Sequence, residues 1–255
     1  MESLGVTQKG SVSEHFATTR WSLILSNGLS EGQCTARDAL NQLCQIYWRP
    51  IFTFICRRGY SPADAQDLTQ DFFVMLLEGK LLASADPGRG RFRCFLLKSL
   101  RNFLINAKIK HQRHKRGGDF IFVSWEEWMA EAPSQLLITA RALEGCPAET
   151  LFDLRWAATV AEQALYRLRE ECESKGHRRA YEILRSYLTA DRAEISYEQL
   201  SEVLRVPATV VKRLMHEFRK RYRILLREEV RQTVDDEADV DEEIRYLCTA
   251  LCAAA

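Results

Sequence analysis

Residues 197–221 read YEQLSEVLRVPATVVKRLMHEFRKR and carry the clearest local pattern of the chain. Ser196 and Gln199 form a capping-box pattern at its start. Apolar residues then recur every three or four positions on both sides of a break near Pro207, as expected for helices that bury one face. The segment therefore predicts a short helix, a three-residue turn and a longer helix. Its core positions are Leu200, Val203, Leu204, Val206, Val211 and Leu214.

This arrangement is that of a helix-turn-helix, a motif whose second helix lies in the major groove of DNA. The second helix is rich in basic side chains, which pair with phosphates and also bind guanine edges. The alternative is an ordinary helical hairpin with a solvated basic face. The candidate duplex-binding residues are Thr209, Lys212, Arg213, His216, Arg219 and Lys220.

A second pattern is a basic segment between residues 87 and 118, which holds ten Lys/Arg and no Asp or Glu. Acid-free basic helices favour nucleic acid or another anionic surface as their partner. Aromatic residues in such a segment can stack on unpaired bases. The spacing of Phe95 and Phe103 fits the buried face of a helix, whereas Phe92 fits either role.

A third pattern is a helix expected to begin with a Ser61 cap and Pro62 and to stop near Gly79. Its polar, largely acidic face lies opposite an apolar stripe that includes Leu68 and Phe72. Such a face is usually only solvated, but its position between two basic elements raises a protein-docking role. The polar positions are Asp64, Asp67, Gln70, Asp71 and Glu78.

The overall composition says little about function, whereas the distribution of charge along the chain says more. The net charge is only +1, although seven of the nine residues 235–243 are acidic. Eight cysteines without a C-x-x-C pair indicate free thiols in a reducing compartment. No signal-peptide pattern or apolar membrane span is evident, so we expect a cytoplasmic protein. No nucleophile elbow, phosphate loop or metal-ligand spacing is present, so we expect no enzyme, catalytic residue, metal or cofactor.

The order of these patterns predicts an all-α fold of two small helical domains. We expect a disordered N-terminus over residues 1–15 and a first domain over 16–116. Residues 117–149 lack sustained periodicity and predict a flexible linker. Residues 150–255 predict a second domain that contains the helix-turn-helix and ends in an acidic helix.

The acidic helix DAQDLTQDFF (64–73), followed by the basic helix with Asn102 near its middle, is similar to region 2 of sigma factors of the sigma-70 family. Residues 197–223 resemble region 4. Further segments more narrowly resemble one group of extracytoplasmic-function (ECF) sigma factors, in the same order along residues 16–251. These segments are TTRWS (18–22), RGYSPADAQDLTQ (58–70), DPGRGRFR (86–93), FDLRWA (152–157) and LREEVRQTV (226–234).

The resemblance implies a transcription initiation factor that binds core RNA polymerase, recognises the −10 and −35 promoter elements and promotes DNA opening. Region 2 would dock on the β′ clamp helices of the polymerase through Asp64, Asp67, Gln70 and Asp71. The following loop and basic helix would capture the −10 element as a single strand, with a base flipped into a pocket. The matching −10 candidates are Arg89, Arg91, Arg93, Arg101, Asn102 and Lys108.

Region 4 would read the −35 element as duplex DNA, through the six residues named above on the second helix of the helix-turn-helix. The resemblance also implies the β flap of the polymerase as a partner, an anti-sigma factor or another regulator, and a monomer when free. The alternative is a stand-alone helix-turn-helix regulator that acts without polymerase. That alternative leaves residues 61–116 unexplained.

Two features depart from the family pattern. The turn has Arg205 where glycine is usual and Pro207 where a capping side chain is usual, which predicts a displaced turn. Glu217 also replaces a residue that is usually basic. The acidic segment 235–243 has two interpretations. It begins a final helix that packs on the second domain through Ile244, Leu247 and Leu251, or it competes with DNA for the basic helix and holds the free factor inactive.

Overall fold

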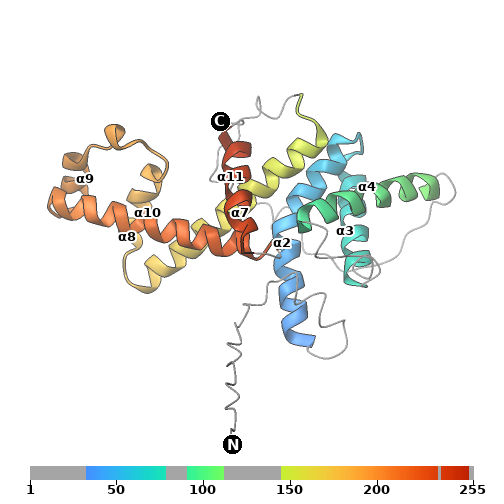
Figure 1. The fold of residues 1–255 in the computed structure, drawn as a ribbon, viewed down its shortest axis with the longest axis horizontal. Coiled ribbons are helices and arrows are strands. Elements are labelled where there is room, and N and C mark those ends of the chain that lie inside the picture. The colour runs from blue at the N-terminus through green and yellow to red at the C-terminus, as the bar shows by residue number, and fades with distance from the viewer. Residues whose placement is uncertain (1–32, 79–90, 112–144, 235–236, 253–255) are drawn as a thin grey trace, which may run out of the picture.

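The computed structural model describes residues 33–78, 91–111, 145–234 and 237–252 (Figure 1). Within these ranges the chain is helical between short turns and contains no strand, which confirms the predicted all-α class. Two 3₁₀ turns, Arg185–Tyr187 and Arg192–Glu194, lie between α8 and α9. The helices are α2 (Gln33–Arg57), α3 (Pro62–Leu77), α4 (Phe92–His111), α7 (Ala148–Ser174), α8 (Arg178–Leu184), α9 (Tyr197–Leu204), α10 (Ala208–Arg231) and α11 (Asp239–Cys252).

The start of α3 follows the predicted capping pattern. The Ser61 hydroxyl accepts a hydrogen bond from the backbone N–H of Asp64 at 3.2 Å, and Pro62 occupies the first turn. The chain reverses just before this cap at Gly59, whose φ of 95° is a left-handed conformation that glycine adopts without a steric penalty. These local interactions fix where α2 ends and α3 begins.

A first core forms among α2, α3 and α4 and extends to helices much later in the chain. Tyr47 of α2 lies between Phe92 of α4 and Phe152 of α7, with ring centroids at 5.3 and 6.4 Å. Trp156 of α7 is fully buried in the same core, as is Val230 at the end of α10. The core therefore combines α2, α3 and α4 with the first half of α7, the end of α10 and α11.

A second core holds the helix-turn-helix. Its buried residues come from the second half of α7, from α8, from α9 and from α10, and they include Tyr181, Leu200 and Phe218. Figure 1 shows α8, α9 and the first part of α10 at one end of the molecule and α3 and α4 at the other. The 27-residue helix α7 contributes to both cores and joins them.

Packing thus crosses the position at which the sequence predicted a second domain to begin. Residues 148–160 and 230–247 supply buried side chains to the first core. The division into domains 16–116 and 150–255 remains a prediction about independent folding. The expected disordered segment 1–15 and nearly all of the expected linker 117–149 lie outside the described residues.

The turn of the helix-turn-helix lies where the motif places it and is not displaced. Arg205 itself adopts the left-handed conformation, with φ 58° and ψ 42°, and ends α9. The Val206 N–H donates to the Ser201 carbonyl at 3.2 Å, and the Ser201 hydroxyl donates to the Val206 carbonyl at 2.7 Å. These two hydrogen bonds hold a non-glycine residue in a conformation that costs about 1–2 kcal/mol.

Candidate functional site

The acidic face of α3 is open to solvent. Asp64, Asp67 and Asp71 are exposed and Gln70 is half-buried. The opposite face of the helix is buried in the first core, with Phe72 fully enclosed. The structure therefore brings the four predicted polymerase-binding residues together on one accessible surface, because the apolar stripe determines which side of α3 faces inward.

The middle and end of α4 present a second polar surface. Arg101, Asn102 and Lys108 are exposed, as the sequence predicted for residues that contact a DNA strand. The apolar side chain of Ile105 lies among them and is 60% exposed. These side chains are arranged so that they could contact a nucleic-acid backbone and the faces of unstacked bases.

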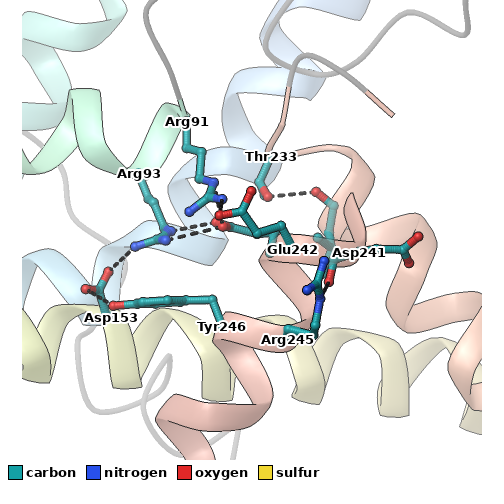
Figure 2. Close-up of polar contacts among 10 residues, drawn as sticks. Arg91, Arg93, Asp153, Thr233, Asp241, Glu242, Arg245 and Tyr246 are labelled. Atoms are coloured by element: carbon teal, nitrogen blue, oxygen red, sulfur yellow. Dashed lines mark hydrogen bonds and ion pairs between the residues drawn. The ribbon is translucent and has the colours of Figure 1, made fainter. Parts of the chain in front are cut away.

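The first turn of α4 differs from this surface, because Arg93 is buried. Its side chain is only 6% exposed and forms a two-point ion pair with Glu243 of α11, with Nε–Oε1 at 2.5 Å and Nη2–Oε2 at 3.2 Å. Asp153 of α7 accepts a third hydrogen bond at 2.7 Å. The guanidinium also lies over the ring of Tyr246 at 4.0 Å (Figure 2).

This environment corrects the prediction that Arg93 lies on a DNA-facing surface. Burial opposes the charge of the guanidinium, but the hydrogen bond and the charge of Glu243 outweigh it, so the pKa of Arg93 lies above its usual range. A buried arginine with two carboxylate partners serves as a tie between α4, α7 and α11.

Arg91 lies immediately before α4, two residues from Arg93, and is more exposed than Arg93. Its guanidinium contacts Glu242 at 2.8 Å and Glu243 at 3.0 Å, and its side chain is partly exposed (Figure 2). Burial lowers the pKa of Arg91, while the hydrogen bond to Glu242 raises it, with a net rise. Arg91 is thus neutralised by α11 but remains accessible, whereas Arg89 lies outside the described residues.

The structure also shows which aromatic residues of α4 are buried in the core. Phe92 is 1% exposed and packs edge-on against Tyr47, so it belongs to the core and does not stack on bases. Phe103 contacts Phe72 with ring centroids at 5.5 Å, as its spacing predicted. No aromatic ring on the described part of α4 is fully exposed.

The helix-turn-helix presents the third polar surface. Five of its six predicted duplex-binding residues are exposed on α10. Arg219 is the exception, since it donates to the carbonyls of Tyr187 at 2.6 Å and Ala190 at 2.5 Å and thereby holds the loop before α9. The exposed residues are Thr209, Lys212, Arg213, His216 and Lys220.

Sequence reasoning missed the partners of the α4 arginines. Glu243, Asp153 and Tyr246 were not singled out, although the acidic run before Tyr246 complements the acid-free run around Arg93. That complementarity was the available signal, but helical periodicity gives no information on contacts 150 residues apart. The final helix packs through Leu247 as predicted, but it packs into the first core, which also contains α2, α3 and α4, and not onto the second domain alone.

The described helices thus form an all-α structure that carries one acidic surface on α3 and two basic surfaces, on α4 and α10. Residues 43–114 match the family model of sigma-70 region 2. This match covers the second half of α2, together with α3 and α4. No curated protein and no solved structure matched the chain.

Two further observations concern the described residues alone. None of their helices is long and apolar enough to cross a membrane. Their His, Cys, Asp and Glu side chains form no group of three or more that could hold a metal ion.

Proposed function

We propose that this protein is an ECF-type sigma factor that binds core RNA polymerase and recognises the −10 and −35 elements of its promoters. The observation that carries the proposal is the region 2 match over residues 43–114, which includes both the acidic α3 and the basic α4. Because both helices pack in one core, polymerase docking and strand capture would occur on a single rigid unit.

The three polar surfaces have the chemistry that this function requires. Carboxylates on α3 are suited to a basic partner surface such as the β′ clamp helices. Exposed Arg101, Asn102 and Lys108 on α4 are suited to a single strand, which needs cations along its phosphates. The exposed residues of α10 are suited to the major groove of the −35 duplex. The β flap and a regulatory protein such as an anti-sigma factor are further proposed partners.

Run-off transcription tests the proposal directly. Purified protein is mixed with bacterial core polymerase and a pool of fragments of the source genome, and a Gln70→Ala, Asp71→Lys variant is run alongside. We expect discrete transcripts that require the protein and weaken in the variant. A Glu170→Lys variant is the control, because it makes the same change in net charge at an exposed position of α7, away from α3 and from the helix-turn-helix.

The opposite outcome identifies the alternative class. If no transcripts appear and the protein does not bind core polymerase, but still binds duplex DNA, the protein is a stand-alone helix-turn-helix regulator. Unchanged transcription by the α3 variant would refute the proposed docking surface while leaving the sigma-factor function intact.

A further inference from the structure

Two carboxylates from the C-terminal half of the chain, one exposed and one partly exposed, pair with arginines in or just before α4 that were predicted to bind the −10 strand. Glu242 of α11 contacts Arg91 at 2.8 Å, on the solvent side of the buried Glu243, which contacts the same guanidinium at 3.0 Å (Figure 2). Glu149, in the first turn of α7, contacts Arg101 at 2.9 Å. The side chains of Glu242 and Glu149 are 62% and 35% exposed, so neither carboxylate is buried with its arginine.

These two pairs lie at separate places along α4. Arg91 immediately precedes the helix and Arg101 lies in its middle, so about 15 Å separates them at the rise of an α-helix. Each carboxylate occupies a position at which a phosphate oxygen would bind the guanidinium. The backbone N–H hydrogen bond of Glu149, followed by Arg101, lowers the pKa of Glu149, so the carboxylate stays ionised near neutral pH.

The exposure of these pairs makes them replaceable. An ion pair at the surface contributes only about 0–1 kcal/mol, so a phosphate of a nucleic acid can displace the carboxylate at small cost. The buried pair between Arg93 and Glu243 is different, since separating it would leave an uncompensated charge in the core. Displacement of Glu242 and Glu149 therefore does not require α11 or α7 to leave the first core.

We propose that Glu242 and Glu149 form an electrostatic cover over the strand-binding surface of α4 and lower the affinity of the free protein for single-stranded nucleic acid. The inference rests on the proposed function, because it takes α4 to be the surface that captures the −10 strand. The cover would disfavour non-specific binding to single strands, which depends mainly on phosphate contacts. A correctly positioned promoter strand, held by further contacts, would displace it.

The test measures binding of the free full-length protein to a labelled DNA oligonucleotide of about 20 nucleotides and mixed sequence, at about 50 mM salt. Fluorescence anisotropy compares Glu242→Gln, Glu149→Gln and the double variant with the unmodified protein. Glu170→Gln is the matched control, because it removes one exposed carboxylate from α7 with the same change in net charge.

We expect each cover substitution to tighten binding by about two- to fivefold, the range for an exposed ion pair. The effects should multiply in the double variant, because the two sites are far apart and share no partner. Glu170→Gln should change binding less than either, and all gains should shrink as salt rises. A gain no larger than that of Glu170→Gln would overturn the inference.

A second variant shows whether the gain acts through the arginine. In an Arg91→Gln background, whose folding is checked by its melting temperature, Glu242→Gln should no longer tighten binding. A gain that persists there would also overturn the inference. Binding of core polymerase, measured in parallel, depends on α3 and therefore tests the proposed function independently. If no variant binds the oligonucleotide, the cover and the strand-capture role of α4 are both refuted.

Discussion

The two basic surfaces of this protein are built in opposite ways. On α10 the cations Lys212, Arg213 and Lys220 lie exposed in the described structure. On α4 the first-turn arginine is buried, and Arg91 and Arg101 are paired with carboxylates from later helices. A count of basic residues treats these surfaces as alike, although one presents its charge to solvent and the other has much of its charge neutralised within the chain.

The largest expected effect is on stability and concerns the buried ion pair between Arg93 and Glu243. Glu243→Ala should lower the free energy of unfolding by about 3–5 kcal/mol, because it leaves Arg93 buried with one carboxylate instead of two. Urea denaturation followed by circular dichroism measures the loss. Glu242→Ala is the control and should cost no more than about 1 kcal/mol, since its side chain is exposed. Equal losses for the two variants would show that the buried pair does not tie the helices together.

The next effect tests whether the α10 cations are as available as their exposure indicates. Arg213→Ala should weaken binding to a mixed-sequence duplex by about five- to tenfold near 0.1 M salt, and the salt slope should fall by about 1. Titrations at several salt concentrations measure both quantities. Lys175→Ala removes an exposed cation from the turn after α7 and should have little effect. A salt slope that Arg213→Ala leaves unchanged would remove Arg213 from the phosphate-binding surface.

A smaller effect concerns the turn that orients α10. Arg205→Gly should raise the free energy of unfolding by about 0.5–1 kcal/mol, because glycine adopts a φ of 58° without the steric penalty that arginine has. Chemical denaturation measures the gain. Arg205→Ala should give none, because alanine keeps the Cβ atom. A similar gain in both variants would attribute the effect to the arginine side chain and not to the backbone.

The smallest expected effect is a change in stability with pH that arises from Tyr246, which lies against Arg93. Burial, followed by the hydrogen bond to Asp153, raises the pKa of Tyr246 to about 12. Since the folded state favours the neutral phenol, its contribution to stability is complete below the usual pKa of about 10 and is lost as pH approaches 12. Melting temperatures across this range should therefore fall less for Tyr246→Phe than for the unmodified protein. Parallel curves would exclude Tyr246 as a titrating part of the tie.

These contrasts show how much of the molecule the sequence predicts. Periodicity and capping predicted the helices well, since Ser61 and Ser196 both cap through their side chains as expected. Exposure on α3 and α10 was also predicted, because an amphipathic helix has one apolar face that must be buried. The positive φ at Arg205 was not predicted. Two hydrogen bonds between Ser201 and Val206 hold the turn in this conformation, and the sequence pattern does not show them.

Contacts between distant segments were the part that sequence patterns could not supply. The helical periodicity around Arg93 allows its side chain to be either half-buried or exposed. Its partners on α7 and α11 determine that it is buried. The same holds for α7, because nothing in its sequence shows that its two halves pack in different cores. Arg219 was likewise predicted to bind DNA. Its carbonyl partners lie in the segment before α9, which has no helical periodicity, so the sequence did not show that Arg219 contacts them.

The ion pair between Arg93 and Glu243 has a consequence for folding of the protein during its synthesis on the ribosome. The two partners lie 150 residues apart in the chain. At a synthesis rate of about 5–20 residues per second, Arg93 is made roughly 8–30 seconds before the carboxylate that neutralises it. During that interval α2, α3 and α4 can begin to assemble, but their core lacks Val240 and Leu247. Completion of the first core is therefore a late event, after the translation of the helix-turn-helix.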